Sequence, residues 1–328
     1  MGAFVLVSSY AFSEMNWLYI ILISYFILSI SNLVDKIFLS KIVTESIVYA
    51  IWVSLLSVFV VLLLVLDVLF NRATGLTSSS FGDLSFMTPW FVVLAVFIGV
   101  LFTLAIYLLY TALQRGEASR IIPLIGGSMP VIIYAMTFWY EPLNASRTIS
   151  FFLLVAGTVL ISVTPGGKHP ASMKNGTYIA LGASVSFALF FVLSQYLFRS
   201  QGFLNGIVWP RLGTAIALIV LFTNEPIRKK MLDSLRHLSF RMRSIWVTSQ
   251  CLGAVGFVGQ QYAISLPNVS VALVSALQST QYVYILIMAT LMTVFRPKLL
   301  KEHLSWRVLL MKLVALGSIG AGLFFVSL

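Results

Sequence analysis

Residues 110–123 read YTALQRGEASRIIP, and about 150 positions later residues 261–274 read QYAISLPNVSVALV. When the two stretches are overlaid, Ala112 falls on Ala263, and in both stretches one apolar segment ends and the next begins. Repetition at a fixed interval is typical of proteins built from duplicated units. The chain therefore predicts two related halves, residues 1–165 and residues 166–328.

A second pair of matching motifs supports the duplication. Glu141-Pro142-Leu143 and Glu302-His303-Leu304 each precede the last apolar segment of their half. Each half carries about five such segments, and an odd number of membrane spans turns the second copy upside down. Two inverted halves around a shared axis are found in many secondary transporters, with the substrate held where the halves meet. We therefore expect an all-α integral membrane protein with ten transmembrane helices as an inverted five-plus-five repeat.

Composition supports a membrane protein. Hydrophobic residues make up 59% of the 328 residues and charged residues only 9%, against about 25% charged in a soluble domain. A membrane span needs about 20 apolar residues, so ten spans leave no room for a soluble domain. The predicted spans are residues 17–39, 46–70, 89–113, 118–140, 148–164, 176–198, 206–224, 245–266, 269–295 and 305–326.

The basic residues are distributed unevenly among the predicted loops. Sixteen lie on odd-numbered loops and three on even-numbered loops and tails, within a net charge of +11. Basic patches that bind nucleic acid are presented by soluble surfaces, so this asymmetry indicates membrane topology and no nucleic-acid partner. Cytoplasmic loops carry the excess of Lys and Arg. Both termini are therefore predicted to face away from the cytoplasm.

The first apolar segment is predicted to be a retained helix. No basic residue precedes Lys36, and residues 17–39 form a longer apolar stretch than the core of a signal peptide. Cys251 is the single cysteine of the chain, which excludes an intramolecular disulfide.

Spans four and nine carry the residues that best predict a binding cavity. In span four Pro123, Gly126, Gly127 and Pro130 weaken the helical ladder, which predicts a broken helix with exposed backbone groups. Span nine has no such breakers, but Gln278 and Gln281 share one face of a polar run. We expect them to orient a substrate by hydrogen bonds, or else to hold neighbouring helices together.

Aromatic and charged residues complete the candidate site. Tyr107, Tyr110 and Tyr134 are expected to form aromatic walls beside Tyr282. Arg211 and Lys312 fall within predicted spans, where each either reaches the headgroups or serves as counter-ion to an anionic substrate group. No carboxylate falls in the middle of a span, so a deep proton-binding acid is not expected. Asp35 closes span one, where it can pair with Lys36 or with a basic residue across the bundle.

The order and spacing of these short motifs resemble the EamA-type family of the drug/metabolite transporter superfamily, in a bacterial branch. The resemblance covers almost the whole chain. It rests on Ala112 to Ser119, Ile122-Pro123-Leu124, Met129-Pro130-Val131, Glu141-Pro142-Leu143, Ala263, Val269, Ser270, Glu302 and the glycines 317, 320 and 322. It implies a ten-span inverted bundle that moves small metabolites, often amino acids or related compounds. Members are generally described with both termini in the cytoplasm, opposite to the charge distribution, which we follow as a property of this chain.

The function predicted from the sequence is secondary transport of small metabolites, amino-acid-like or otherwise polar or amphipathic, by alternating access around a central cavity. One alternative is a flippase or translocator of a lipid-linked or phosphorylated metabolite. An integral membrane enzyme is a weaker alternative, because His169, His237 and His303 are scattered over loops without metal-ligand spacing. We expect no cofactor or metal, a small-molecule substrate and the lipid bilayer as partners, a monomer or homodimer, and the plasma membrane of a prokaryote.

Overall fold

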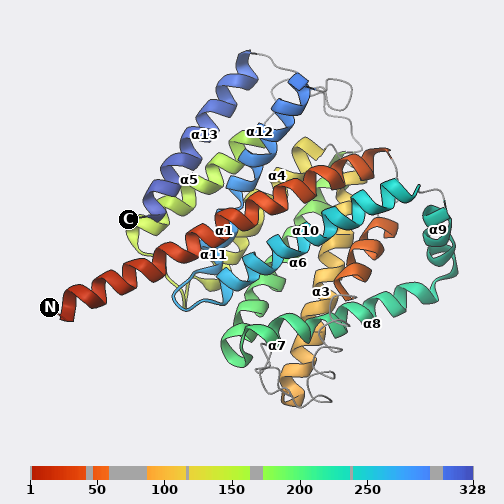
Figure 1. The fold of residues 1–328 in the computed structure, drawn as a ribbon, viewed down its shortest axis with the longest axis horizontal. Coiled ribbons are helices and arrows are strands. Elements are labelled where there is room, and N and C mark those ends of the chain that lie inside the picture. Colours follow the sequence, from red (N-terminus) through yellow and green to blue (C-terminus); the bar gives the residue numbers. More distant parts are fainter. Residues whose placement is uncertain are drawn as a thin grey trace.

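The structure is a computed structural model that describes residues 2–41, 47–58, 87–115, 118–162, 173–236, 239–295 and 306–327. Helices and short connections make up these ranges, without a strand among them (Figure 1). The prediction of an all-α chain is therefore confirmed. Gly116, the second Glu-containing motif at Glu302, the three histidines and the second predicted span beyond residue 58 lie outside the described residues.

The helices follow one another along the chain with short connections. Their bounds are α1 Gly2–Lys41, an unlabelled helix Ile47–Val58, α3 Pro89–Arg115, α4 Ala118–Thr137, α5 Ala145–Ser162, α6 Met173–Gln201, α7 Phe203–Val208, α8 Pro210–Thr223, α9 Glu225–Arg236, α10 Phe240–Ser265, α11 Val271–Ala276, α12 Ser279–Phe295 and α13 Trp306–Val326.

Within the described ranges, five helical segments are long and apolar enough to cross a membrane. They are Trp17–Asp35, Pro89–Arg115, Gly176–Gln201, Phe203–Thr223 and Val271–Met288. Shorter apolar helices lie at Ile47–Val58, Leu124–Thr137, Ala145–Ile161 and Leu310–Val326. Large hydrophobic side chains such as Tyr19, Trp90 and Phe324 are exposed on the outer faces of these helices, an arrangement that fits a lipid-facing surface better than water.

Several helices begin at residues that satisfy free backbone groups. The Asn144 side chain accepts a hydrogen bond from the Arg147 amide (2.8 Å) where α5 begins, and the Ser239 side chain accepts one from the Met242 amide (3.3 Å) where α10 begins. Pro210 is the first residue of α8, a position where its missing N–H costs nothing. These caps fix the helix starts locally, whatever the surrounding packing.

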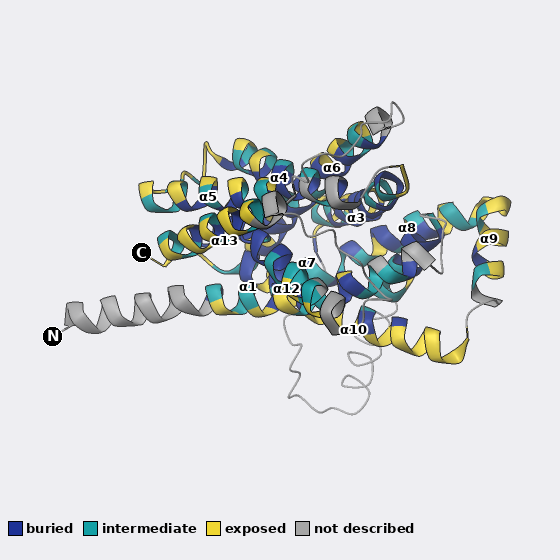
Figure 2. Ribbon diagram, turned by 90° about the horizontal axis from the view of Figure 1, so that it is seen from above, coloured by how far each residue is buried: buried dark blue, intermediate teal, exposed yellow. Residues whose placement is uncertain are grey.

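Pairs of helices distant in sequence pack along each other. α1 lies along α10, α3 along α6, and α5 along α13 (Figure 1). Buried faces turn towards the middle of the bundle, whereas α9 and the start of α10 are exposed (Figure 2). Small residues allow the contact between α1 and α10, because a Cβ at Gly253 would meet Ser31 and one at Gly256 would meet Leu28 and the Ser24 backbone.

Spans four and nine differ from the prediction in where the helix is interrupted. α4 continues without interruption through Pro123 and Pro130, because losing single donors leaves the rest of the helical ladder intact. The predicted span nine is instead divided between α11 and α12 at Leu277 and Gln278. There the amide of Gln278 bonds to the Ser275 carbonyl (3.2 Å) and that of Gln281 to the Gln278 carbonyl (3.0 Å), which tightens the chain into a turn.

Two further departures concern the segment after α6. The predicted span at residues 206–224 is interrupted at Trp209, so that α7 and α8 together take its place. The basic connection between spans seven and eight contains a helix of its own, the charged α9. Its surface is exposed (Figure 2), and it begins where the Asn224 side chain accepts a hydrogen bond from the Ile227 amide (3.4 Å).

Candidate functional site

A small cavity lies where α3, α6, α7, α8 and α10 meet. Its lining combines aromatic, small and polar side chains: Gly99, Phe102, Phe190, Ser194, Gly206, Ile207, Pro210, Arg211, Thr214 and Gln261. The space holds about one water molecule. We call it the Arg211 cavity, because Arg211 is the single charged residue among the described residues of its lining.

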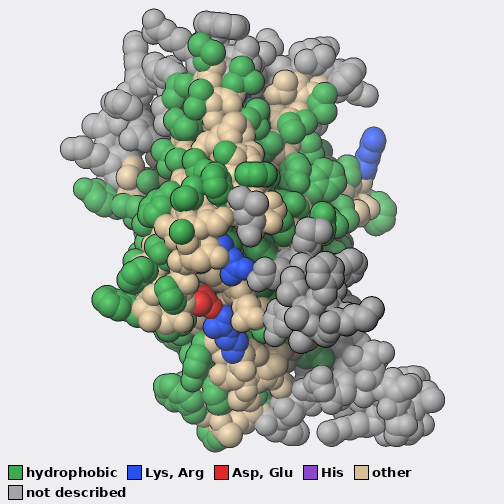
Figure 3. Space-filling view, turned by 90° about the vertical axis from the view of Figure 1, so that its left-hand side faces the viewer, with side chains coloured by type: hydrophobic (Ala, Val, Ile, Leu, Met, Phe, Trp, Pro, Cys, Tyr) green, Lys and Arg blue, Asp and Glu red, His purple; other side chains and the backbone are tan. Residues whose placement is uncertain are grey.

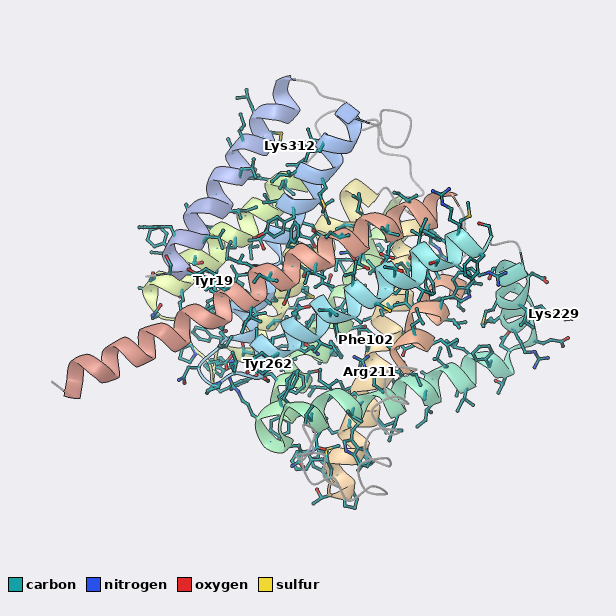
Figure 4. The ribbon with its side chains drawn as sticks, in the orientation of Figure 1. Tyr19, Phe102, Arg211, Lys229, Tyr262 and Lys312 are labelled. Carbon is teal, nitrogen blue, oxygen red and sulfur yellow. The ribbon has the colours of Figure 1, made fainter. Side chains whose placement is uncertain are left out.

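Arg211 lies next to the first residue of α8, where Pro210 directs it into the bundle. Its guanidinium carbon is 5.3 Å from the centre of the Phe102 ring and 5.6 Å from that of Phe257, both within the range of cation–π attraction. Figure 4 shows Arg211 beside Phe102, well inside the bundle. Within the described part of the chain, Arg211 forms no ion pair with a carboxylate.

Aromatic rings form one side of this site. The ring centres of Phe102 and Phe190 are 5.1 Å apart, and those of Phe102 and Phe257 are 5.5 Å apart. Phe190 and Phe257 stack at 6.2 Å. These rings stabilise a cation electrostatically, yet they offer its N–H donors no strong acceptor.

Two polar groups share the lining with Arg211. Thr214 donates from its hydroxyl to the Gly99 carbonyl (3.3 Å). The buried amide oxygen of Gln261 has no hydrogen-bond partner in the described residues. An unpaired buried polar atom is costly in a folded protein, so Gln261 is suited to meet a bound molecule or an ordered water.

A larger open cavity lies at the end of the bundle formed by the connections after α4, α6 and α10. Its volume is about 700 Å³, and we call it the vestibule. It is lined by Tyr140, Glu141, Pro142, Leu143, Arg147, Phe198, Arg199, Ser265, Pro267, Asn268 and Ser270.

An ion pair between Glu141 and Arg199 lies in the wall of the vestibule. Gln195 fixes this region by donating to the Val269 carbonyl (3.0 Å) and to Glu141 (3.4 Å). Figure 3 shows acidic and basic side chains close together on a mainly hydrophobic face. Arg147 also lies in the lining of the vestibule.

The vestibule and the Arg211 cavity follow each other along the same two helices. On α6, Ser194 lines the cavity and Phe198 the vestibule; on α10, Gln261 and Ser265 do the same. Residues four apart occupy one face of a helix, about one turn from each other. The buried Phe198 ring packs against Gly206 of the cavity lining, so this ring separates the two spaces.

A polar network around Asp35 closes the end of the helix bundle opposite the vestibule. Tyr49 and Gln250 both donate to one carboxylate oxygen of Asp35, at 2.5 and 2.6 Å. Trp246 donates to the Tyr49 hydroxyl (3.1 Å), and the Tyr110 ring packs edge-on against Tyr49 at 5.0 Å. The network ties together α1, the helix Ile47–Val58, α3 and α10. Since Gln250 lies about two turns along α10 from Phe257, the Asp35 network is separate from the Arg211 cavity.

Of the eight residues predicted for the site, Arg211 lines the cavity and the other seven line neither space. Gln281 is buried, and Gln278 has an unpaired buried oxygen, both beside the turn between α11 and α12. Tyr110 belongs to the Asp35 network. Tyr134 packs on Phe151 at 4.9 Å.

The remaining candidates have other neighbours. Tyr282 lies against α4, where a Cβ at Gly126 would overlap its ring. Tyr107 packs against the hydrophobic core. Lys312 lies on α13, away from Arg211 (Figure 4), and α13 packs mainly on α5. The predicted convergence of spans four and nine with these residues is therefore not the arrangement around the Arg211 cavity.

Sequence reasoning missed the aromatic cluster, Gln261 and the Asp35 network. Gln261 carried a signal, because it is a polar residue in an apolar helix, four positions before Ser265. The phenylalanines carried none, since 25 of them are spread along the chain. Asp35 was assigned to a loop or to a basic partner, whereas neutral donors from two other helices hold it.

The comparisons with known proteins bear on the fold alone. No family model matches the chain, and a search of curated proteins likewise gave no match. Among solved structures, one described only as a crystal structure of a protein superposes with a TM-score of 0.63 at 14% sequence identity, covering 94% of this chain and 98% of the other. The chain is thus similar over nearly its full length to a solved fold, at an identity too low to carry function.

Proposed function

We propose that this chain is a secondary transporter of small metabolites that works by alternating access around the Arg211 cavity. The observation that carries the proposal is the guanidinium of the half-buried Arg211, without a carboxylate partner among the described residues, in an internal cavity below an open vestibule. A charge inside an apolar bundle is costly unless something pairs with it, and such residues mark substrate pathways.

The helix pairings support two inverted halves of five spans each. If the first half is exchanged with the second, α1 takes the place of α6, and α3 takes that of α10. The pairing of α1 with α10 then becomes the pairing of α6 with α3, and the pairing of α5 with α13 maps onto itself. Similarly, α8 packs on α3, and the helix Ile47–Val58 meets α10 through Trp52 and Trp246 (5.2 Å).

The vestibule end and the Asp35 end of the bundle differ in a way that alternating access requires. At the vestibule end, the Phe198 ring lies between the vestibule and the Arg211 cavity. At the other, hydrogen bonds between Asp35, Tyr49 and Gln250 hold three helices together. We propose that transport opens the Asp35 end while the Phe198 end closes.

A cysteine-accessibility experiment tests this proposal without knowledge of the substrate. In a Cys251→Ser background, single cysteines replace Ser265 in the vestibule or Ile106, which lies between Phe102 and Tyr110 on α3. We expect a membrane-impermeant maleimide to label the cysteine at 265 but not the one at 106. Adding Asp35→Ala removes the acceptor of the network, so labelling at 106 should rise and labelling at 265 should fall.

Glu225→Ala provides the matched control, because it removes a carboxylate from the exposed Glu225–Lys229 pair. It should change maleimide labelling at neither position. If Asp35→Ala raises labelling at both positions together, the chain forms an open pore or unfolds locally. If Asp35→Ala changes labelling at neither position, the Asp35 network is not a gate. Either result contradicts alternating access around this cavity.

A further inference from the structure

We infer that the Arg211 cavity binds a small organic monocarboxylate with an apolar body, rather than a zwitterionic amino acid or a neutral solute. This inference rests on the proposed function, because it names the substrate class of the same site. It follows from three properties of the lining: the number of charges, the free hydrogen-bonding groups and the chemistry of the walls.

The charge of the site favours one negative group. Arg211 is the single ionisable residue in the cavity lining as far as the structure describes the chain. The Phe102 and Phe257 rings, at 5.3 and 5.6 Å, stabilise its charge without neutralising it. A monoanion would balance the site, whereas a dianion would leave one buried charge uncompensated, a costly state in an apolar bundle.

The hydrogen-bonding groups favour a carboxylate. A guanidinium carries five donors in a planar fork that matches the two oxygens of a carboxylate. No hydrogen bond from Arg211 to a residue of the described ranges uses these donors. Ser194, which faces the cavity from α6, can supply a further hydroxyl donor to the same group.

The absence of an acid from the lining disfavours an amino acid. An α-ammonium group needs acceptors, and an ion pair with a carboxylate is the usual means of burying it. The described lining of the cavity contains no Asp or Glu. Its unpaired amide oxygen, on Gln261, is neutral and can accept a hydrogen bond without forming an ion pair. Glu141 is the acid of the vestibule, and Arg199 already pairs with it.

The walls favour an apolar body. Phe102, Phe190, Ile207 and Pro210 present hydrophobic surface beside Arg211. Binding sites of this kind combine apolar walls with a few polar groups that fix orientation. Since the cavity holds about one water in this state, the ligand must displace the Phe198 ring from Gly206 on its way from the vestibule.

Binding measurements on the purified full chain test the inference. The probes are phenylacetate, its neutral analogue phenylacetamide, the zwitterion phenylalanine, and isocaproate as a second carboxylate with an apolar body. We expect both carboxylates to bind, and phenylacetamide and phenylalanine to bind at least about tenfold more weakly, since a hydrogen-bonded charge pair accounts for a factor of that order.

Variants assign the effect to Arg211. Arg211→Gln should weaken phenylacetate binding by about ten- to a hundredfold, and Arg211→Lys less, because it keeps the charge and loses the fork. Arg228→Gln is the matched control, because it removes the same charge from an exposed position of α9 and should bind like the unmodified chain. Thermal melting of each variant shows whether it folds; should Arg211→Gln fail to fold, the comparison of probes on the unmodified chain still decides.

Equal binding of phenylacetamide and phenylacetate overturns the inference, as does tighter binding of phenylalanine or no binding of either carboxylate at millimolar concentration. These outcomes are separable from failure of the proposed function. If the labelling of the two cysteines alternates but both carboxylates fail to bind, only the substrate class is rejected. If carboxylates bind in a way that depends on Arg211 but the labelling of the two cysteines does not alternate, the anion site is retained. Transport by alternating access is then rejected.

Discussion

Two glycines decide how closely the helix that carries Arg211 approaches its neighbour. A Cβ at Gly99 of α3 would overlap the Pro210 carbonyl, and a Cβ at Gly213 of α8 would overlap the Val96 carbonyl. The obstacles are backbone atoms, which cannot turn aside as a side chain can. The close crossing of α3 and α8 therefore holds Arg211 over the Phe102 ring.

We predict that Gly213→Ala destabilises the protein by about 1–3 kcal/mol, the usual cost of inserting a methyl group into packed structure. It should also weaken binding of phenylacetate, because separation of α3 from α8 moves Arg211. Thermal melting and a binding titration measure the two effects.

Gly320→Ala is the control, since a Cβ there meets nothing within 4 Å. Alanine favours a helix by up to about 1 kcal/mol over glycine, so this variant should melt no lower than the unmodified chain. A Gly213→Ala variant as stable as Gly320→Ala would contradict the close crossing.

At the scale of elements, serine side chains join α5 to α13. Ser150 donates to the Gly322 carbonyl and Ser318 to the Leu153 carbonyl, both at 2.7 Å, so each helix donates to the other. Gly322 allows this approach by lying against Leu154, whereas Gly317 and Gly320 meet no neighbour. Of the three glycines of the last span, Gly322 is thus the one at which a neighbouring helix packs closely.

We expect Ser150→Ala to lower the free energy of unfolding by about 0.6 kcal/mol, the average for hydrogen bonds between membrane helices, and the Ser150→Ala, Ser318→Ala pair by about twice that. Reversible unfolding in mixed micelles measures both. Ser200→Ala removes a hydroxyl that bonds within its own helix at an exposed position (Ser200 to the Tyr196 carbonyl, 2.9 Å). A loss as large in Ser200→Ala as in Ser150→Ala would show that the inter-helix bonds contribute nothing specific.

At the scale of the whole molecule, the two chain termini lie on the side opposite α9 (Figure 1). Ser146, just after the vestibule loop, donates to the Phe325 carbonyl (2.7 Å) near the end of the chain. The basic residues of α9, including Arg228 and Lys230, lie at the other side. Orientation in the membrane therefore also decides which compartment the vestibule faces.

We predict that α9 faces the cytoplasm and that both termini and the vestibule face away from it, because odd-numbered loops carry the basic residues. A reporter that works only in the cytoplasm, fused after residue 328, should be inactive, and one that works only outside it should be active. The opposite pair of results would reverse the orientation while leaving the helix pairings unchanged.

The sequence by itself determined the class of structure and one residue of the candidate site. High apolar content with few charges predicts helices, because an apolar segment satisfies its own backbone hydrogen bonds only as a helix or in a closed barrel. Most predicted span boundaries fall within a few residues of the helices observed, since caps such as Asn144 act locally. Arg211 could be singled out because a charged residue within an apolar stretch is recognisable from the sequence alone.

Tertiary structure alone decided which residues surround that charge. Phe102 lies on α3, whereas Phe257 and Gln261 lie on α10, more than 100 positions further along the chain. Their meeting around Arg211 depends on the contact of α3 with α8 at two glycines. The break between α11 and α12 and the continuity of α4 also departed from expectation. Helix propensity is a weak local preference, and packing in the bundle outweighs it. Asp35 shows the same principle, because its donors, Tyr49 and Gln250, lie 14 and 215 positions away and only the folded bundle brings them to one carboxylate.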